Sequence, residues 1–170
     1  DETIPFKGST LISGENTQGK TTILDAIQMV LTADTHRFNQ AANEKSNRSL
    51  IGYVRCKLGD DERSFGRTGV VVSHVALEFY EEDKQKYFTI GVVLVSENSD
   101  SPVIPKWYRT ECSLDLINFV EDGIPTLPRN LRQKGSPVLL LDRNAYKEQI
   151  LIRFGRLENR FFDLIRNSIA

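Results

Sequence analysis

The chain has 170 residues, of which 39% are hydrophobic and 26% are charged, an ordinary composition for one globular domain with its own core. It contains no apolar run of about 20 residues, the length needed to cross a bilayer, and no signal-peptide pattern at its start. The formal net charge of −1 excludes a uniformly basic surface, so any contact with nucleic acid must be local.

The two cysteines and the chain ends add two expectations. Cys56 and Cys112 have neither metal-ligand spacing nor a disulfide-rich setting, which favours reduced thiols in a cytoplasmic protein. The sequence opens on Asp1 rather than on Met, and it stops at Ala170 inside a helical pattern. We therefore expect a piece of a larger protein.

The first predicted element is a short buried strand over residues 9–13, followed at once by a glycine-containing loop. From Lys20 to about Leu31, apolar residues recur at helical spacing and predict a helix with one buried face. That face consists of Ile23, Ala26, Ile27, Val30 and Leu31. Residues 33–69 are polar and follow neither period, so we expect mostly loop, with one short helix as an option.

A β-hairpin is predicted next. Residues 70–80 form its first strand, a charged turn covers 81–86, and residues 87–95 form its second strand. The residues expected to share one face of the first strand are Val71, Val75, Leu77 and Phe79. Residues 96–136 are rich in proline and have little pattern, which indicates an irregular segment.

The last third begins with a short apolar strand over residues 138–141. Asp142 or Asn144 then caps a helix that runs to about Phe154, with Gly155 as a natural stop. A final helix from Arg156 onward would bury one apolar stripe. The stripe comprises Leu157, Phe161, Leu164, Ile165 and Ile169. This order of elements predicts an α/β domain with a mixed β-sheet.

The glycine-containing loop carries the most specific motif. Residues 14–21 match the phosphate-loop pattern G-x-x-x-x-G-K-[ST] in full. The glycines let successive backbone N–H groups point at phosphates, and the following helix adds the positive end of its dipole. Lys20 is expected to reach the β- and γ-phosphates, and the Thr21 hydroxyl to ligate Mg²⁺. A chance match is the alternative, expected in roughly one chain of this length in a hundred or fewer.

We therefore predict that the chain binds ATP with Mg²⁺. The nucleotide-binding residues are Gly14, Glu15, Asn16, Thr17, Gln18, Gly19, Lys20, Thr21 and Thr22, with Thr21 as the metal ligand and Lys20 as a catalytic residue.

The loop continues into Ile-Leu-Asp-Ala-Ile at residues 23–27. A phosphate loop with Asn as its third residue that runs into this string resembles the ABC-type heads of SMC proteins and of SbcC repair ATPases. Three further strings are similar to the MukB-like SMC subunits of Wadjet plasmid-defence complexes, the JetC family. They are ADTHRFNQAANEKS at 33–46, GYVRCKLG at 52–59 and RLENRFF at 156–162.

The resemblance implies a P-loop NTPase head that is split in sequence. Residues 1–170 would be its N-terminal lobe, while a long coiled coil and a C-terminal lobe with the signature motif and the Walker B acid would lie outside this chain. Thr17 and Gln18 depart from the Gly and Ser or Ala usual in ABC loops, but both would contribute mainly backbone N–H groups.

The resemblance also implies a function and partners. Two heads of the same protein would enclose two ATP molecules, and hydrolysis would drive DNA loop extrusion in defence against plasmids. Kleisin, winged-helix and nuclease subunits and double-stranded DNA would be the partners, in the bacterial cytoplasm. Other ATPase heads, those of a MukB-like condensin or of an SbcC-type repair enzyme, are alternatives. A stand-alone P-loop NTPase or kinase, or a nucleotide-binding scaffold, would be another class.

Two further candidates concern the phosphates. Residues 138–142 have the form of a Walker B strand ending in Asp142, but Arg143 stands where a catalytic Glu would follow, and a helix cap explains the Asp equally well. The resemblance implies that Arg48, in an Arg-Ser-Leu context, approaches the nucleotide in a catalytic role; an exposed loop arginine is the alternative.

The remaining candidates are weaker. Arg153, Arg156 and Arg160 form a basic stripe if the helix continues, either for DNA or as a solvated face. Gln133 and Gln149 do not have the context of a Q-loop glutamine, so neither is assigned that role. His36 and His74 have no partner at metal-ligand spacing.

Overall fold

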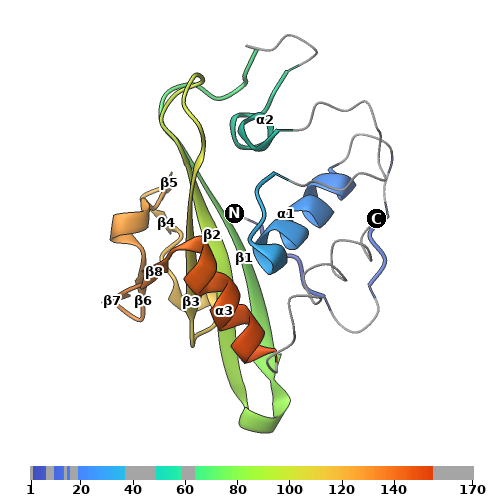
Figure 1. Ribbon diagram of the computed structural model, residues 1–170, viewed down its shortest axis with the longest axis vertical. Helices are drawn as coiled ribbons and strands as arrows, with labels where there is room; N and C mark the ends of the chain where they lie inside the picture. The colour runs from blue at the N-terminus through green and yellow to red at the C-terminus, as the bar shows by residue number, and fades with distance from the viewer. Residues whose placement is uncertain are drawn as a thin grey trace.

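The computed structural model describes residues 2–6, 10–13, 15, 19–36, 49–58 and 64–154. Within these residues, three α-helices accompany one four-stranded sheet (Figure 1). The helices are α1 (Lys20–Thr32), α2 (Leu50–Arg55) and α3 (Arg143–Arg153). The sheet has the order β1 (Val71–Glu81), β2 (Lys86–Ser96), β3 (Ile104–Thr110) and β8 (Leu140–Leu141), and its described pairings are all antiparallel.

The predicted hairpin is confirmed and forms the long axis of the molecule (Figure 1). Val71 pairs with Ser96 at one end of the β1–β2 ladder, and Glu81 pairs with Lys86 at the other. Between the strands, the 3₁₀ turn η2 (Glu82–Lys84) ends at Gln85 in the left-handed conformation. Because side chains alternate across a strand, the ladder presents one row of side chains to each face of the sheet.

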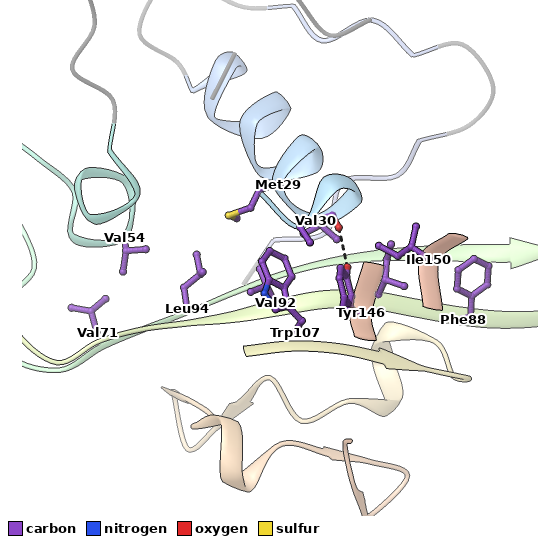
Figure 2. Packing of buried hydrophobic residues seen from close by; sticks show 12 residues of the cluster. Met29, Val30, Val54, Val71, Phe88, Val92, Leu94, Trp107, Tyr146 and Ile150 are labelled. Carbon is purple, nitrogen blue, oxygen red and sulfur yellow. Dashed lines mark hydrogen bonds between the residues drawn. The ribbon is translucent and has the colours of Figure 1, made fainter. Parts of the chain in front are cut away.

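One face of the sheet packs against the helices and carries the main core. The expected row Val71, Val75, Leu77 and Phe79 belongs to this core, as predicted. Its fully buried members include Val30 of α1, Val92 of β2, and Tyr146 and Ile150 of α3. Figure 2 shows these side chains between the helices above and the sheet below.

The other face is covered by a small lobe, residues 112–138, which contains the strand pairs β4 (Val120–Glu121) with β5 (Ile124–Pro125) and β6 (Arg132–Gln133) with β7 (Ser136–Pro137). A second buried cluster lies between this lobe and the sheet. It contains Val93, Tyr108, Cys112, Ile117, Leu131 and Val138. Both faces of the sheet are therefore buried, which explains the nearly continuous apolar sequence of β2.

Gly91 permits the close packing of β2 on β3. A Cβ atom at this position would lie 2.4 Å from the hydroxyl oxygen of Tyr108 and 2.8 Å from the carbonyl oxygen of Val75. Gly91 pairs with Ala76 of β1 on one side and with Tyr108 of β3 on the other, so the Val75 carbonyl is fixed by the ladder, and the Tyr108 ring is confined by its complete burial. A side chain at position 91 would force the strands apart.

Strand β3 was missed by the sequence analysis, which expected residues 96–136 to be irregular. Pro105 and the scattered prolines around it conceal a seven-residue strand that buries Trp107 and Tyr108. Proline is tolerated because β8 pairs only with Trp107 and Tyr108, so the Pro105 end of β3 lies at an edge among the described residues.

The expected strand over residues 9–13 is wrong for its described part. Residues 10–13 belong to no strand, and Leu11 is 88% exposed. Two adjacent apolar side chains flanked by Thr and Ser provide too little apolar surface to hold a strand in the core. Without this strand, the sheet is antiparallel rather than mixed in the part of the chain that the structure describes.

Helix α1 matches its predicted bounds within one residue, but its buried face is rotated. Of the predicted face, Val30 is fully buried, whereas Ile23, Ala26 and Ile27 are half-buried. The buried residues also include Asp25 and Gln28. The burial is concentrated in the second half of the helix because that half lies over the sheet.

Helix α3 fixes the C-terminal end of α1. The Tyr146 hydroxyl donates a hydrogen bond of 2.9 Å to the Val30 carbonyl, and the Arg143 guanidinium donates one of 2.6 Å to the Ala33 carbonyl (the first drawn in Figure 2). The last carbonyl groups of a helix have no N–H donor within the helix. Helix α3 supplies such donors to the end of α1. Helix α3 ends at Arg153, close to the predicted end; Gly155 and the final predicted helix lie outside the described residues.

We predict that Tyr146→Phe lowers the free energy of unfolding by about 1–3 kcal/mol, because it leaves the buried Val30 carbonyl without its donor. Urea denaturation of both proteins measures the change. Tyr87→Phe, which removes a half-exposed hydroxyl on the hairpin, is the matched control and should change the stability by less than about 0.5 kcal/mol. Equal stabilities for all three proteins would contradict this assignment.

His74 joins β1 to the small lobe. Its Nε2 lies 2.8 Å from the Thr126 carbonyl oxygen, so Nε2 carries the proton, and its ring packs edge-on against Phe119. Nδ1 is buried without a hydrogen-bond partner among the described residues. Burial lowers the pKa of His74 below its ordinary value of 6.5, and the Thr126 carbonyl opposes this shift. The neutral ring therefore belongs to the folded state.

This lowered pKa predicts a pH dependence of stability. Below about pH 6.5 His74 is protonated in the unfolded chain but stays neutral in the folded chain, because its folded pKa is lower. The free energy of unfolding therefore falls as the pH drops toward the folded pKa. His74→Gln keeps an N–H donor for Thr126 and does not titrate. Denaturation of both proteins between pH 8 and pH 5 should show a steeper acid loss for the wild type; parallel curves would contradict the account.

Candidate nucleotide-binding site

The phosphate loop is described at Glu15 and at Gly19, Lys20, Thr21 and Thr22. The other four predicted nucleotide-binding residues lie outside the described residues. They are Gly14, Asn16, Thr17 and Gln18. The local geometry of the site is therefore that of the junction between the loop and α1.

Gly19 makes the turn from the loop into α1. Its backbone has φ 81° and ψ 8°, in the left-handed region that glycine adopts without strain. A Cβ there would meet nothing within 4 Å, so the requirement for glycine comes from the backbone conformation rather than from space. The second glycine of the motif is thus explained by the path of the chain.

The N-terminus of α1 suits an anion. Gly19 has no side chain to cap the helix, and the first turn contains no acidic residue. The first backbone hydrogen bond runs from the Ile23 N–H to the Gly19 carbonyl at 3.1 Å, so the preceding N–H groups have no acceptor within the helix. These donors and the helix dipole favour a phosphate at this end.

Lys20 supplies a positive charge at the same end. Its ammonium donates a hydrogen bond of 2.5 Å to the carbonyl oxygen of Glu15, so the side chain folds back across the loop. An acceptor oxygen on the loop thus holds the ammonium close to the helix N-terminus. A phosphate oxygen would replace a neutral acceptor with a charged one, which is the stronger hydrogen bond. The described residues therefore fit a bound phosphate.

The opposite end of α1 is the buried one. In Figure 1 the residue-20 end of the helix points away from the sheet, whereas Met29, Val30 and Ala33 are buried in the core. A 13-residue helix is roughly 20 Å long, so the two ends are well separated. Any group that contacts the C-terminal end of α1 is too far from Lys20 to share a phosphate with it.

Asp142 is the cap of α3, which confirms the cap interpretation over the Walker B interpretation. Its carboxylate accepts hydrogen bonds of 2.9 Å from the Asn144 and Ala145 N–H groups and caps α3. The next residue, Arg143, binds the carbonyl of Ala33 at the far end of α1. The preceding strand is two residues long, and Leu139 is 71% exposed, unlike the buried strand of a Walker B motif.

A cavity of about 890 Å³ lies at this far end of α1. Its walls come from the end of α1, from α2 and from the β3–β8 edge, and are mainly apolar, with Trp107 at one side. Its polar lining residues are Thr35, His36, Ser49, Lys106, Asp142 and Arg143. The cavity is large enough for a nucleotide, but the described phosphate-loop residues do not line it, and the α3 N-terminus at its wall is already capped by the Asp142 side chain.

The predicted arginines are only partly described. Arg48, Arg156 and Arg160 lie outside the described residues. Arg153 contacts Glu81 at 2.8 Å and Glu111 at 3.3 Å, and its guanidinium lies 4.2 Å from the centre of the Phe88 ring. Its side chain is 15% exposed, so its charge serves to hold α3 on the hairpin rather than to present a surface for DNA.

The two glutamines also lie away from the phosphate loop. The Gln133 side chain accepts a contact of 3.7 Å from the Cys112 thiol inside the small lobe, and Gln149 is within α3. Neither has the position of a Q-loop residue, in agreement with the sequence analysis.

One contact near the site was not predicted from the sequence. The Tyr53 hydroxyl of α2 donates a hydrogen bond of 2.5 Å to the carboxylate of Asp25, which is 2% exposed. The available signal was an acidic residue within the apolar stretch of the first helix, since a buried carboxylate requires a partner.

Comparisons with known proteins support the loop assignment. Residues 1–45 match the model of the P-loop containing region of AAA domain family. A comparison with curated proteins found no match. None of the described helices is both long and apolar enough to cross a membrane. The first 45 residues therefore carry a P-loop NTPase region, which indicates nucleotide binding.

Substitution of Asp142 separates a helix cap from a metal-holding acid. Asp142→Asn should leave stability and ATP affinity unchanged, since Asn caps helices as well as Asp does. Asp142→Ala should lower the free energy of unfolding by about 0.5–2 kcal/mol, without affecting ATP affinity. Denaturation and ATP titration measure both effects. Loss of Mg²⁺-dependent ATP binding in Asp142→Asn would restore the Walker B interpretation.

Proposed function

We propose that this chain binds ATP with Mg²⁺ through residues 14–22 and forms the N-terminal lobe of an SMC-like ATPase head. The observation that carries the proposal is the complete phosphate-loop motif joined, through left-handed Gly19, to the uncapped N-terminus of a 13-residue helix. In this proposal the Lys20 ammonium exchanges the Glu15 carbonyl for phosphate oxygens, and the Thr21 hydroxyl is the protein ligand of Mg²⁺.

Hydrolysis requires more than the described residues supply. A water must be oriented and charge on the γ-phosphate stabilised, and the Asp142 carboxylate is engaged in capping α3. We therefore propose that turnover occurs with a C-terminal lobe and a paired second head. Arg48, which directly precedes the N-cap of α2, is proposed to approach the nucleotide in that assembly.

The finer proposal rests on the strings at 33–46, 52–59 and 156–162. Their similarity to the Wadjet SMC subunits supports a DNA motor that extrudes loops in plasmid defence, located in the bacterial cytoplasm. Its partners would be kleisin, winged-helix and nuclease subunits and double-stranded DNA. Of the basic stripe, Arg156 and Arg160 are the proposed DNA contacts, because Arg153 is engaged by two carboxylates.

The proposal is tested at Lys20. Lys20→Ala should weaken ATP binding at least tenfold, which corresponds to about 1.4 kcal/mol, because the ammonium that neutralises the β- and γ-phosphates is lost. Isothermal titration of the chain with MgATP measures the affinity. Lys86→Ala, at an exposed position on β2, is the matched control and should bind like the wild type.

Two results would contradict the proposal. Equal affinity of Lys20→Ala and wild type would remove the phosphate loop as the binding site. Rapid ATP hydrolysis by the 170-residue chain alone, independent of protein concentration, would favour a stand-alone P-loop enzyme over a paired head.

A further inference from the structure

Besides sharing the apolar core, helix α2 is joined to the phosphate-loop helix by a partly buried hydrogen bond. The donor is the Tyr53 hydroxyl in the middle of α2, and the acceptor is the Asp25 carboxylate of α1, at 2.5 Å. Asp25 lies five residues beyond Lys20, which is about 7.5 Å along the helix axis. The contact is therefore close to the phosphate loop along α1, although Tyr53 is 28 residues away in sequence.

The C-terminal end of α2 is attached to the sheet. Arg55 is 1% exposed, and its guanidinium donates to four oxygen atoms of three residues at the open end of the hairpin. The acceptors are the hydroxyl and carbonyl oxygens of Ser96 and the carbonyl oxygens of Arg67 and Gly69, at 2.7–3.1 Å. A buried guanidinium with four acceptors is costly to move, so this end of α2 follows the sheet.

A six-residue helix does not stabilise itself, because helix nucleation is unfavourable and the gain per residue is small. Its order depends on its attachments. Arg55 fixes α2 to Ser96 of β2 and to the segment just before β1, and Tyr53 links it to α1. Removal of the Tyr53 hydroxyl would leave α2 attached to the sheet through Arg55 but without this polar link to the phosphate-loop helix.

We propose that Tyr53 is a positioning residue that makes the order of α2 depend on nucleotide bound at the N-terminus of α1. The inference rests on the proposed ATP site. Bound phosphate provides acceptors for the first N–H groups of α1 and stabilises its first turns. Asp25 lies directly beyond these turns, and its hydrogen bond to Tyr53 passes the stabilisation to α2.

Amide hydrogen exchange with and without MgATP tests this coupling. The reporters are hydrogen-bonded amides: residue 23 for α1, and residues 53 and 57 for α2. With ATP at ten times its Kd, exchange through openings that release the nucleotide slows by up to about tenfold. We expect slowing at all three amides in the wild type. In Tyr53→Phe we expect it to persist at residue 23 and to disappear at 53 and 57.

Two further variants separate positioning from general stability. Tyr146→Phe also removes a buried hydroxyl from an α1 contact, but on the opposite end of the helix, and should keep the response of α2 to ATP. Asp25→Asn retains an oxygen acceptor for Tyr53 and should also keep it. If ATP no longer slowed exchange in α2 in either variant, the positioning role of Tyr53 would be overturned. This test remains available even if Tyr53→Phe fails to fold.

The outcomes distinguish this inference from the proposed function. Slowing at residue 23 but not at α2 in the wild type, or an unchanged α2 response in Tyr53→Phe, would overturn the coupling and leave ATP binding intact. No slowing at residue 23 in the wild type would remove the ATP site itself, and the coupling with it.

Discussion

The hydrogen bond from Tyr146 to the Val30 carbonyl joins segments 116 residues apart and determines how the phosphate-loop helix is mounted. Together with the Arg143 contact to Ala33, it holds the C-terminal end of α1 against the sheet and α3. The N-terminal end of α1 then points away from the sheet (Figure 1). A nucleotide-binding helix requires a rigid attachment at one end and an open anion site at the other.

The sheet provides this support because both of its faces are covered. The helices bury one face, the small lobe buries the other, and Arg153 and His74 fix these layers through polar contacts at opposite faces. Arg153 shows how a charge stripe can mislead. Two carboxylates and an aromatic ring surround its guanidinium, so its charge is used within the fold.

Local patterns predicted the elements whose signals are local. The period of 3.6 residues gave α1, alternation gave the hairpin, and Asp142 before a polar–apolar repeat gave the cap of α3. Strand β3 could not be found, because its proline is permitted by an edge position that only the tertiary structure reveals. The strand expected over residues 9–13 failed for the converse reason, since two apolar residues do not specify a strand without a neighbour to pair with. The phosphate loop could be predicted because phosphate and Mg²⁺ binding require glycine, lysine and threonine at fixed positions in the sequence.

The proposed site places phosphate at the N-terminus of α1 and not in the 890 Å³ cavity at its other end. Backbone amide chemical shifts during a titration with MgATP test this placement most directly. The placement predicts large, saturable shifts at Gly19, Lys20 and Thr21, with small changes at Ala33, Trp107 and Leu141, which line the cavity. Shifts confined to the cavity residues, with the loop amides unmoved, would contradict it.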